Sequence, residues 1–164
     1  MMRALILIVC LGLVACLPKS APIQGSTPVP TTQTDSDLEL ESAIRQARDT
    51  LDVFTEKVGT PHPDRTFVGL KVRFYPPDEL PQDIWVDEVT YSNGSFRGNI
   101  GDDIPSLRLE AGEKITVQEK DILDWMIVEE GILIGGYTIR LAVQRMSPEE
   151  EERFLETLDY TIED

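Results

Sequence analysis

The stretch DILDWMIVEEGILIGGYTIRL, residues 121–141, holds the side chains of this sequence that are best suited to chemistry. A Trp wall, a carboxylate and a guanidinium that converge beside a glycine pair could form a pocket where the backbone approaches a ligand or a peptide. The alternative is structural, with a helix cap, a core Trp and an Arg-to-Asp salt bridge that tie the fold together. We expect the structural alternative. The residues concerned are Asp121, Asp124, Trp125, Tyr137 and Arg140.

Other patterns that carry catalysis do not occur in the sequence. His62 is the single histidine, so neither a multi-histidine metal site nor a Ser-His-Asp triad can be built in the usual way. The pair Gly135 and Gly136 lacks the lysine and the following helix of a phosphate-binding loop. We therefore expect no enzyme, no catalytic residue, no metal and no cofactor. A small hydrolase that uses carboxylates near Trp125 is the enzymatic alternative.

The charge of the chain restricts its partners. Thirty acidic residues against fifteen basic ones give a formal net charge of -15. Such a surface repels nucleic acid and anionic headgroups, so nucleic acid is excluded as a partner. The segment SPEEEERFLETLDYTIED, residues 147–164, holds eight acids and one Arg. It is either a solvated helix face or a docking surface for a basic partner, as in an immunity-like protein that neutralises a toxin.

The N-terminus has the features of an export signal. Arg3 precedes an apolar run of eleven residues, 4–14, whereas a transmembrane helix needs about 20. The motif LVAC, residues 13–16, resembles the lipobox of bacterial lipoprotein signal peptides. The resemblance implies removal of residues 1–15 and lipidation of Cys16. An ordinary signal-peptidase site and an uncleaved anchor are the alternatives.

Residues 16–36 are expected to be a lipidated cysteine followed by a disordered tether. The segment is rich in Pro, Ser and Thr and has few large apolar residues, so burial cannot offset the entropy lost on ordering. A coil of this length spans about 25 Å. The membrane is thus an expected partner through the lipid anchor. Leu17 follows the cysteine where an Asp would mark inner-membrane retention in enterobacteria, which favours the outer membrane, facing the periplasm.

Residues 37–164 are expected to be a single domain that begins with a helix. The apolar spacing predicts an amphipathic helix over residues 37–58, with Asp37 capping its start and Gly59 its end. A last helix is predicted from the capping box Ser147 to Glu150. The apolar positions of the first helix are Leu40, Ile44, Ala47, Leu51, Phe54 and Val58.

Between these helices the sequence predicts strands. FVGLKVRFY, residues 67–75, alternates apolar and polar side chains, and Asn93-Gly94 predicts a hairpin. Asp121 is predicted to cap a short helical turn, and ILIGGYTIRLAVQ, residues 132–144, to be a long strand with a bulge at its glycine pair. The expected fold class is α+β, an antiparallel sheet of five or six strands flanked by an N-terminal and a C-terminal helix.

Two blocks together resemble a known family. They are IWVDEVTYSNGSFRGNI, residues 84–100, and AGEKITVQEKDILDWMIVEEGILIGGYTIRLAVQRMSPEEEERF, residues 111–154. The chain is similar over about residues 65–155 to the bacterial domain-of-unknown-function family 2314, also called YegJ-like. The resemblance implies the domain assignment and brings no reaction with it. With the anchor and the tether, it leads us to expect an envelope lipoprotein that acts as a non-enzymatic binding module for a protein partner.

Overall fold

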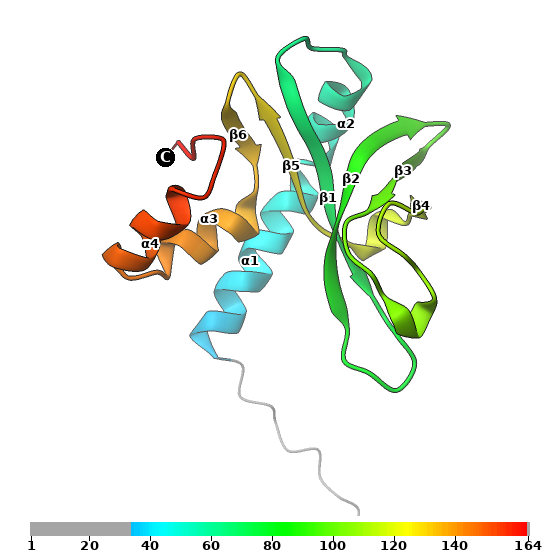
Figure 1. Cartoon of the computed structure of the whole chain (residues 1–164), viewed down its shortest axis with the longest axis horizontal. Coiled ribbons are helices and arrows are strands. Elements are labelled where there is room, and N and C mark those ends of the chain that lie inside the picture. Colours follow the sequence, from blue (N-terminus) through cyan, green and yellow to red (C-terminus); the bar gives the residue numbers. More distant parts are fainter. Residues whose placement is uncertain (1–33, 164) are drawn as a thin grey trace, which may run out of the picture. The chain divides into compact units, whose positions relative to one another are not determined.

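Six antiparallel strands form one open sheet in the order β4-β3-β2-β1-β5-β6, and helices lie at its ends (Figure 1). The computed structural model describes residues 34–163. Within them the fold is α+β, with four helices and six strands, so the predicted fold class is confirmed. Cys16 and most of the predicted tether lie outside the described residues. The strands are β1 Arg65–Phe74, β2 Gln82–Ser92, β3 Ser95–Ile100, β4 Lys114–Val117, β5 Ile122–Glu129 and β6 Ile132–Gly135.

The predicted first helix is two helices, α1 Asp35–Asp49 and α2 Leu51–Gly59. Thr34, and not Asp37, is the N-cap, while Asp37 is the third helical residue and completes the capping box. The break falls at Thr50. The indole Nε1 of Trp125 donates to the Ala47 carbonyl oxygen at 2.9 Å, which satisfies an acceptor near the end of α1.

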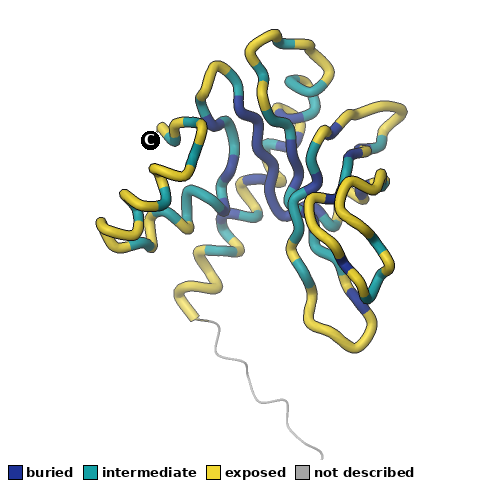
Figure 2. Tube along the Cα trace, viewed as in Figure 1, coloured by how far each residue is buried: buried dark blue, intermediate teal, exposed yellow. Residues whose placement is uncertain are grey.

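The main core lies between α1, α2 and one face of the sheet. Phe54 and Trp125 form its centre, with ring centroids 5.4 Å apart and almost no exposed surface. Successive residues of a strand point to opposite faces, so Met126, next to Trp125, belongs to a second apolar cluster on the other face. Ile139, Tyr160 and Ile162 pack against that second cluster. Strand β5, which lies between β1 and β6, is therefore buried on both sides, as Figure 2 shows.

The predicted helical turn that begins at Asp121 is wrong. A short 3₁₀ turn covers Glu119–Asp121 and ends at Asp121, and Ile122–Glu129 is strand β5. The error has a physical reason. Because both faces of β5 are covered, its side chains show no alternation of apolar and polar residues, and periodicity alone cannot tell such a strand from a buried helix.

The long strand predicted over residues 132–144 is also wrong. Strand β6 ends at Gly135, and helix α3 Tyr137–Gln144 follows. Gly135 and Gly136 have φ values of +74° and +66°, a backbone conformation that ends a strand and that L side chains rarely adopt. The glycine pair is thus the junction of a strand and a helix. Apolar residues of α3 also recur at every second position, which is the period of a strand and explains the error: Tyr137, Ile139, Leu141 and Val143.

Helix α4 Pro148–Leu155 begins at the predicted capping box, in which Ser147 is the N-cap and Glu150 the third helical residue. No residue of α4 is buried. After it, the chain returns to the outer edge of β6, where the Leu133 amide donates to the Thr161 carbonyl oxygen at 2.9 Å. This C-terminal segment covers one edge of the sheet.

Candidate functional site

The carboxylate of Asp124 is fully buried and accepts four hydrogen bonds. Its Oδ1 accepts hydrogen bonds from the backbone amides of Trp125, at 2.8 Å, and Tyr137, at 3.1 Å. Its Oδ2 accepts from the amide and the hydroxyl of Thr138, both at 2.7 Å. Gly136, the N-cap residue of α3, has no side chain to offer. Asp124 therefore caps α3 from the neighbouring strand, where a carboxylate also complements the helix dipole.

The environment of Asp124 acts on its pKa in two directions. Burial removes water from the carboxylate and raises the pKa above its ordinary value, while the hydrogen bonds from Thr138, Trp125 and Tyr137 lower it. Burial has the larger effect, so the net shift is upward. The carboxylate has no exposed surface. In this conformation it cannot touch a substrate that arrives from solvent.

Trp125 and Tyr137 join the sheet, α3 and the break between α1 and α2. Their rings meet edge to face with centroids 6.0 Å apart. The Tyr137 hydroxyl lies 2.9 Å from the Thr50 hydroxyl, which also accepts from Trp125 Nε1 at 3.2 Å. Trp125 is 2% exposed, so it is a core residue and forms no wall of an open pocket.

Asp121 does not join this group. It ends the 3₁₀ turn before β5, is half-buried, and its backbone amide donates to the Gln118 carbonyl oxygen at 2.9 Å. Three of the predicted site residues, Asp124, Trp125 and Tyr137, are thus brought together, and Trp125 is a core residue as the structural alternative expected.

Arg140 makes no ion pair with Asp124. Its guanidinium donates to three backbone carbonyl oxygens, those of Gly135 and Leu133 at 2.9 Å and that of Glu163. These acceptors belong to β6 and to the C-terminal segment. The predicted salt bridge is therefore wrong, and Arg140 instead ties α3 to β6 and to the C-terminal segment.

Replacing Arg140 with Ala is expected to loosen the C-terminal segment while the main core stays intact. Three hydrogen bonds from one guanidinium are lost, and a loss of stability of about 1–2 kcal/mol follows. The amides of Leu133 and Thr161, which pair β6 with this segment, should exchange with solvent faster than in the wild-type chain. Hydrogen exchange of the full chain measures this. In Arg145→Ala, which removes an exposed pair with Glu39, both amides should keep their protection.

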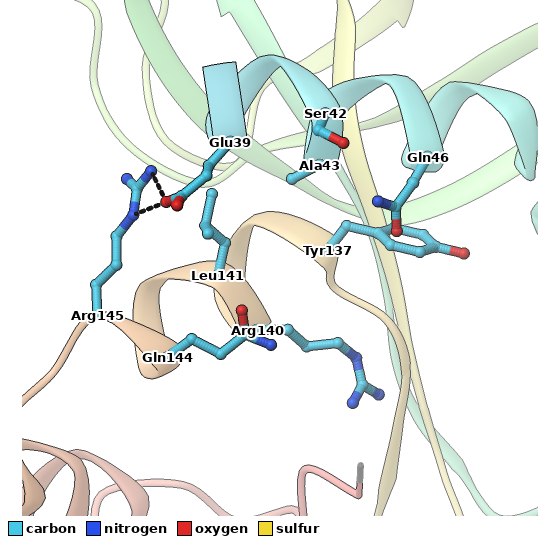
Figure 3. A pocket seen from close by; sticks show the side chains of 9 residues that line it. All are labelled: Glu39, Ser42, Ala43, Gln46, Tyr137, Arg140, Leu141, Gln144 and Arg145. Carbon is cyan, nitrogen blue, oxygen red and sulfur yellow. Dashed lines mark hydrogen bonds and ion pairs between the residues drawn. The ribbon is translucent and has the colours of Figure 1, made fainter. Parts of the chain in front are cut away.

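A groove of about 490 Å³ lies between α1 and α3 (Figure 3). Each helix contributes residues at a spacing of three and four, so one face of α1 opposes one face of α3. In the figure the guanidinium of Arg140 turns away from α1, and its stem lines the groove. The lining residues are Glu39, Ser42, Ala43 and Gln46 from α1, and Tyr137, Arg140, Leu141, Gln144 and Arg145 from α3 and its end.

The polar groups of the groove differ in how far they are already engaged. Arg145 pairs with Glu39 at 2.9 Å, and that pair is the interaction drawn among the lining residues (Figure 3). Gln46 and Gln144 are exposed and Ser42 is half-buried, and in the figure no bond joins their side chains to another labelled residue. Amide and hydroxyl groups both donate and accept hydrogen bonds. The groove therefore offers neutral hydrogen-bonding groups to an incoming molecule.

Sequence reasoning did not identify this groove. Tyr137 and Arg140 are among the predicted site residues, but Leu141 and Gln144, their neighbours on the helix, fall at the end of the predicted strand. The signal was present, because these four positions follow the i, i+3, i+4, i+7 spacing of one helix face. Within residues 34–163, no group of His, Cys, Asp and Glu side chains could hold a metal ion. The same part of the chain has no helix long and apolar enough to cross a bilayer.

Comparison with known proteins gives a family and no activity. The family model described as "Uncharacterized protein conserved in bacteria (DUF2314)" matches residues 37–160. The chain is 33% identical over 102 residues to the uncharacterized protein YegJ of Escherichia coli (strain K12), which covers 61% of this chain and 64% of that protein. It is 32% identical over 88 residues to a putative ankyrin repeat protein of Neisseria meningitidis serogroup B, which covers 51% of this chain and 35% of that protein.

The chain thus spans less than two thirds of the length of both relatives. No solved structure matches it. The resemblance seen in the sequence is confirmed, and the match begins earlier than the quoted blocks, at the N-terminal part of α1. With most of its described residues inside the match, the chain belongs to the uncharacterized bacterial protein family DUF2314.

Proposed function

We propose that the chain is a lipid-anchored interaction module of the bacterial envelope, which binds a protein partner through the groove between α1 and α3. The observation that carries this proposal is the set of neutral, exposed amide groups that face the groove. A volume of about 490 Å³ lies in the range of known binding sites, about 300–1,000 Å³. Peptide groups carry one donor and one acceptor each, so Gln46 and Gln144 suit a peptide backbone.

The charges around the groove support a neutral peptide surface over a charged ligand. Arg145 is paired with Glu39 at 2.9 Å, and the guanidinium of Arg140 already donates hydrogen bonds to three carbonyl oxygens. A charged ligand would have to displace these bonds. The name of the Neisseria relative supports a protein partner as well, because ankyrin repeats form solenoids whose concave surfaces bind other molecules.

The motif LVAC and its Cys16, which lie outside the described residues, support the lipid anchor. Two or more acyl chains hold a protein on a membrane far more firmly than one, since each buried methylene contributes about 0.8 kcal/mol. The groove begins at Glu39, one helical turn after the start of α1. A partner bound there would be held near the membrane surface.

A tagged full chain, crosslinked in intact cells and then captured, tests both parts of the proposal. The double variant Gln46→Ala with Gln144→Ala should capture about tenfold less partner, because hydrogen bonds worth about 1.5 kcal/mol in total are lost. Gln118→Ala, an exposed glutamine outside the groove, is the matched control and should capture as much as the wild type. Cys16→Ser should leave the membrane fraction and no longer incorporate labelled palmitate.

The groove and the lipid anchor are each contradicted by a separate result of this experiment. Equal capture by the double variant and by the Gln118 control would exclude the groove as the binding surface. Palmitate incorporation that persists in Cys16→Ser would exclude the lipid anchor. The burial of Asp124 favours this proposal over the hydrolase alternative, whose carboxylate must meet its substrate.

A further inference from the structure

Helix α4 has an apolar side that the domain covers only in part. Phe154 of this helix and Met146, which lies just before it in the chain, are half-buried, and Leu155 is 38% exposed. No residue of the helix is buried. An amphipathic helix normally hides its apolar stripe against a core. Figure 2 shows α4 mostly in the exposed class, beside the better covered α3.

A hollow of about 510 Å³ lies where α4 meets the end of α3, next to the groove between α1 and α3, with which it shares Arg145. Ala142 and Met146 line it from one side, and Phe154 and Thr157 from the other. Its size falls in the range of sites that hold a ligand or an anchoring side chain. An apolar side chain from another molecule would fit here and complete the burial of Phe154.

The charge around the hollow selects the kind of molecule. Residues 149–159 hold six acids and one Arg. The hollow itself is lined by Arg145, Arg153 and Glu150. Arg145 pairs with Glu39 at 2.9 Å, whereas Arg153 donates only to the backbone carbonyl oxygen of Glu149, at 2.9 Å, and keeps its charge, so the six acids outnumber one charged Arg. The net field is therefore negative, and it attracts cations and slows the approach of anions.

We infer that the hollow between α3 and α4 is a docking site for a basic partner segment that inserts one apolar side chain beside Phe154 and Met146. The acids of α4 attract the basic residues on either side of that anchor. This inference is independent of the proposed function, because the hollow shares only Arg145 with the groove and the inference holds whether or not the groove binds a partner.

The two methionines of the described residues provide the test. Met146 lines the hollow, whereas Met126 is 6% exposed in the second apolar cluster and serves as an internal control. The full chain, in non-ionic detergent and with methyl-labelled methionine, is titrated with a short lysine-rich peptide that carries a central leucine. The Met146 methyl signal, assigned with Met146→Leu, should shift, and the Met126 signal should not.

Three variants and two peptides define the site. Phe154→Ser should weaken the binding of the peptide at least about tenfold, because an apolar anchor contact is lost, while Leu155→Ser, on the same helix and outside the hollow, should leave it unchanged. Glu149→Gln combined with Glu152→Gln keeps the core intact and should weaken both the binding and its dependence on salt. A peptide with serine in place of leucine should shift Met146 far less.

Several results would overturn the inference. An equal shift with the serine peptide would mean that charge alone attracts the peptide and that no anchor enters the hollow. Tighter binding of a glutamate-rich peptide with a central leucine would make the hollow a carboxylate site around Arg153. No shift of Met146 with any peptide would mean that the hollow binds no such segment.

Discussion

Replacing Asp124 with Asn should lower the free energy of unfolding by about 2–4 kcal/mol. An Asn side chain has the same size but only one acceptor oxygen, so its amide group must face either the two donors now bound to Oδ1 or the two bound to Oδ2. Helix α3 loses its cap in both cases. Urea denaturation of the full chain, followed by Trp fluorescence, measures the effect.

Two matched changes separate the cap from a general effect of charge. Asp121→Asn alters a half-buried carboxylate three residues earlier and should change stability by less than about 0.5 kcal/mol. Thr138→Val removes one of the four hydrogen bonds to Asp124 and should cost about 1 kcal/mol. If Asp124→Asn is as stable as the wild type, the capping role is wrong, and a functional role for this carboxylate becomes the better explanation.

The shifted pKa of Asp124 makes the stability difference between the wild type and Asp124→Asn depend on pH. Because burial raises this pKa in the folded state above its ordinary value of 3.8, the folded chain holds the proton more tightly than the unfolded chain. The contribution of Asp124 to stability is therefore greatest below pH 3.8 and declines as the pH rises from there through the folded pKa. The stability difference between wild type and Asp124→Asn should be larger at the acidic end of this window.

Replacing Gly135 with Ala should be at least as costly, at about 3–5 kcal/mol. A Cβ atom at this position would lie 2.5 Å from the Trp125 carbonyl oxygen and 2.6 Å from its ring, in addition to the strain of a φ of +74°. Neither the backbone of β5 nor the buried ring can move without disturbing the core. Thermal unfolding of the full chain, followed by circular dichroism, gives the loss.

Gly131 is the matched control for Gly135. It has the same φ of +74°, and a Cβ atom there would meet nothing within 4 Å. Gly131→Ala should therefore show the backbone strain alone, about 1–2 kcal/mol. Equal losses for the two variants would mean that contact with Trp125 does not determine the need for glycine at Gly135.

The sequence predicted best the features that a local pattern of residues marks. The alternation in β1, the Asn93-Gly94 hairpin and the capping box at Ser147 are all found in the structure. Strand β5 was missed because both of its faces are covered. Helix α3 was missed because its cap is Asp124, thirteen residues before Tyr137, and no local capping residue marks its start.

The candidate site was predicted in part. Asp124, Trp125 and Tyr137 do meet, but as supports of the fold, and the spacing of these residue types could not reveal how deeply they are buried. The groove between α1 and α3 depends on the packing of two helices that are about ninety residues apart in the chain. No local pattern connects Gln46 with Gln144. Their pairing follows only from the position that Asp124 and the glycine pair impose on α3.

Site-specific photocrosslinking in intact cells tests the central claim most directly. A photoreactive amino acid replaces Gln144 in the groove, and in a parallel chain it replaces Lys114 on strand β4, outside the groove. We predict one discrete protein adduct from position 144, lost when Gln46 is also changed to Trp to fill the groove, and no such adduct from position 114. No adduct from position 144, or the same adducts from both positions, would contradict the claim that this domain binds a partner through the groove.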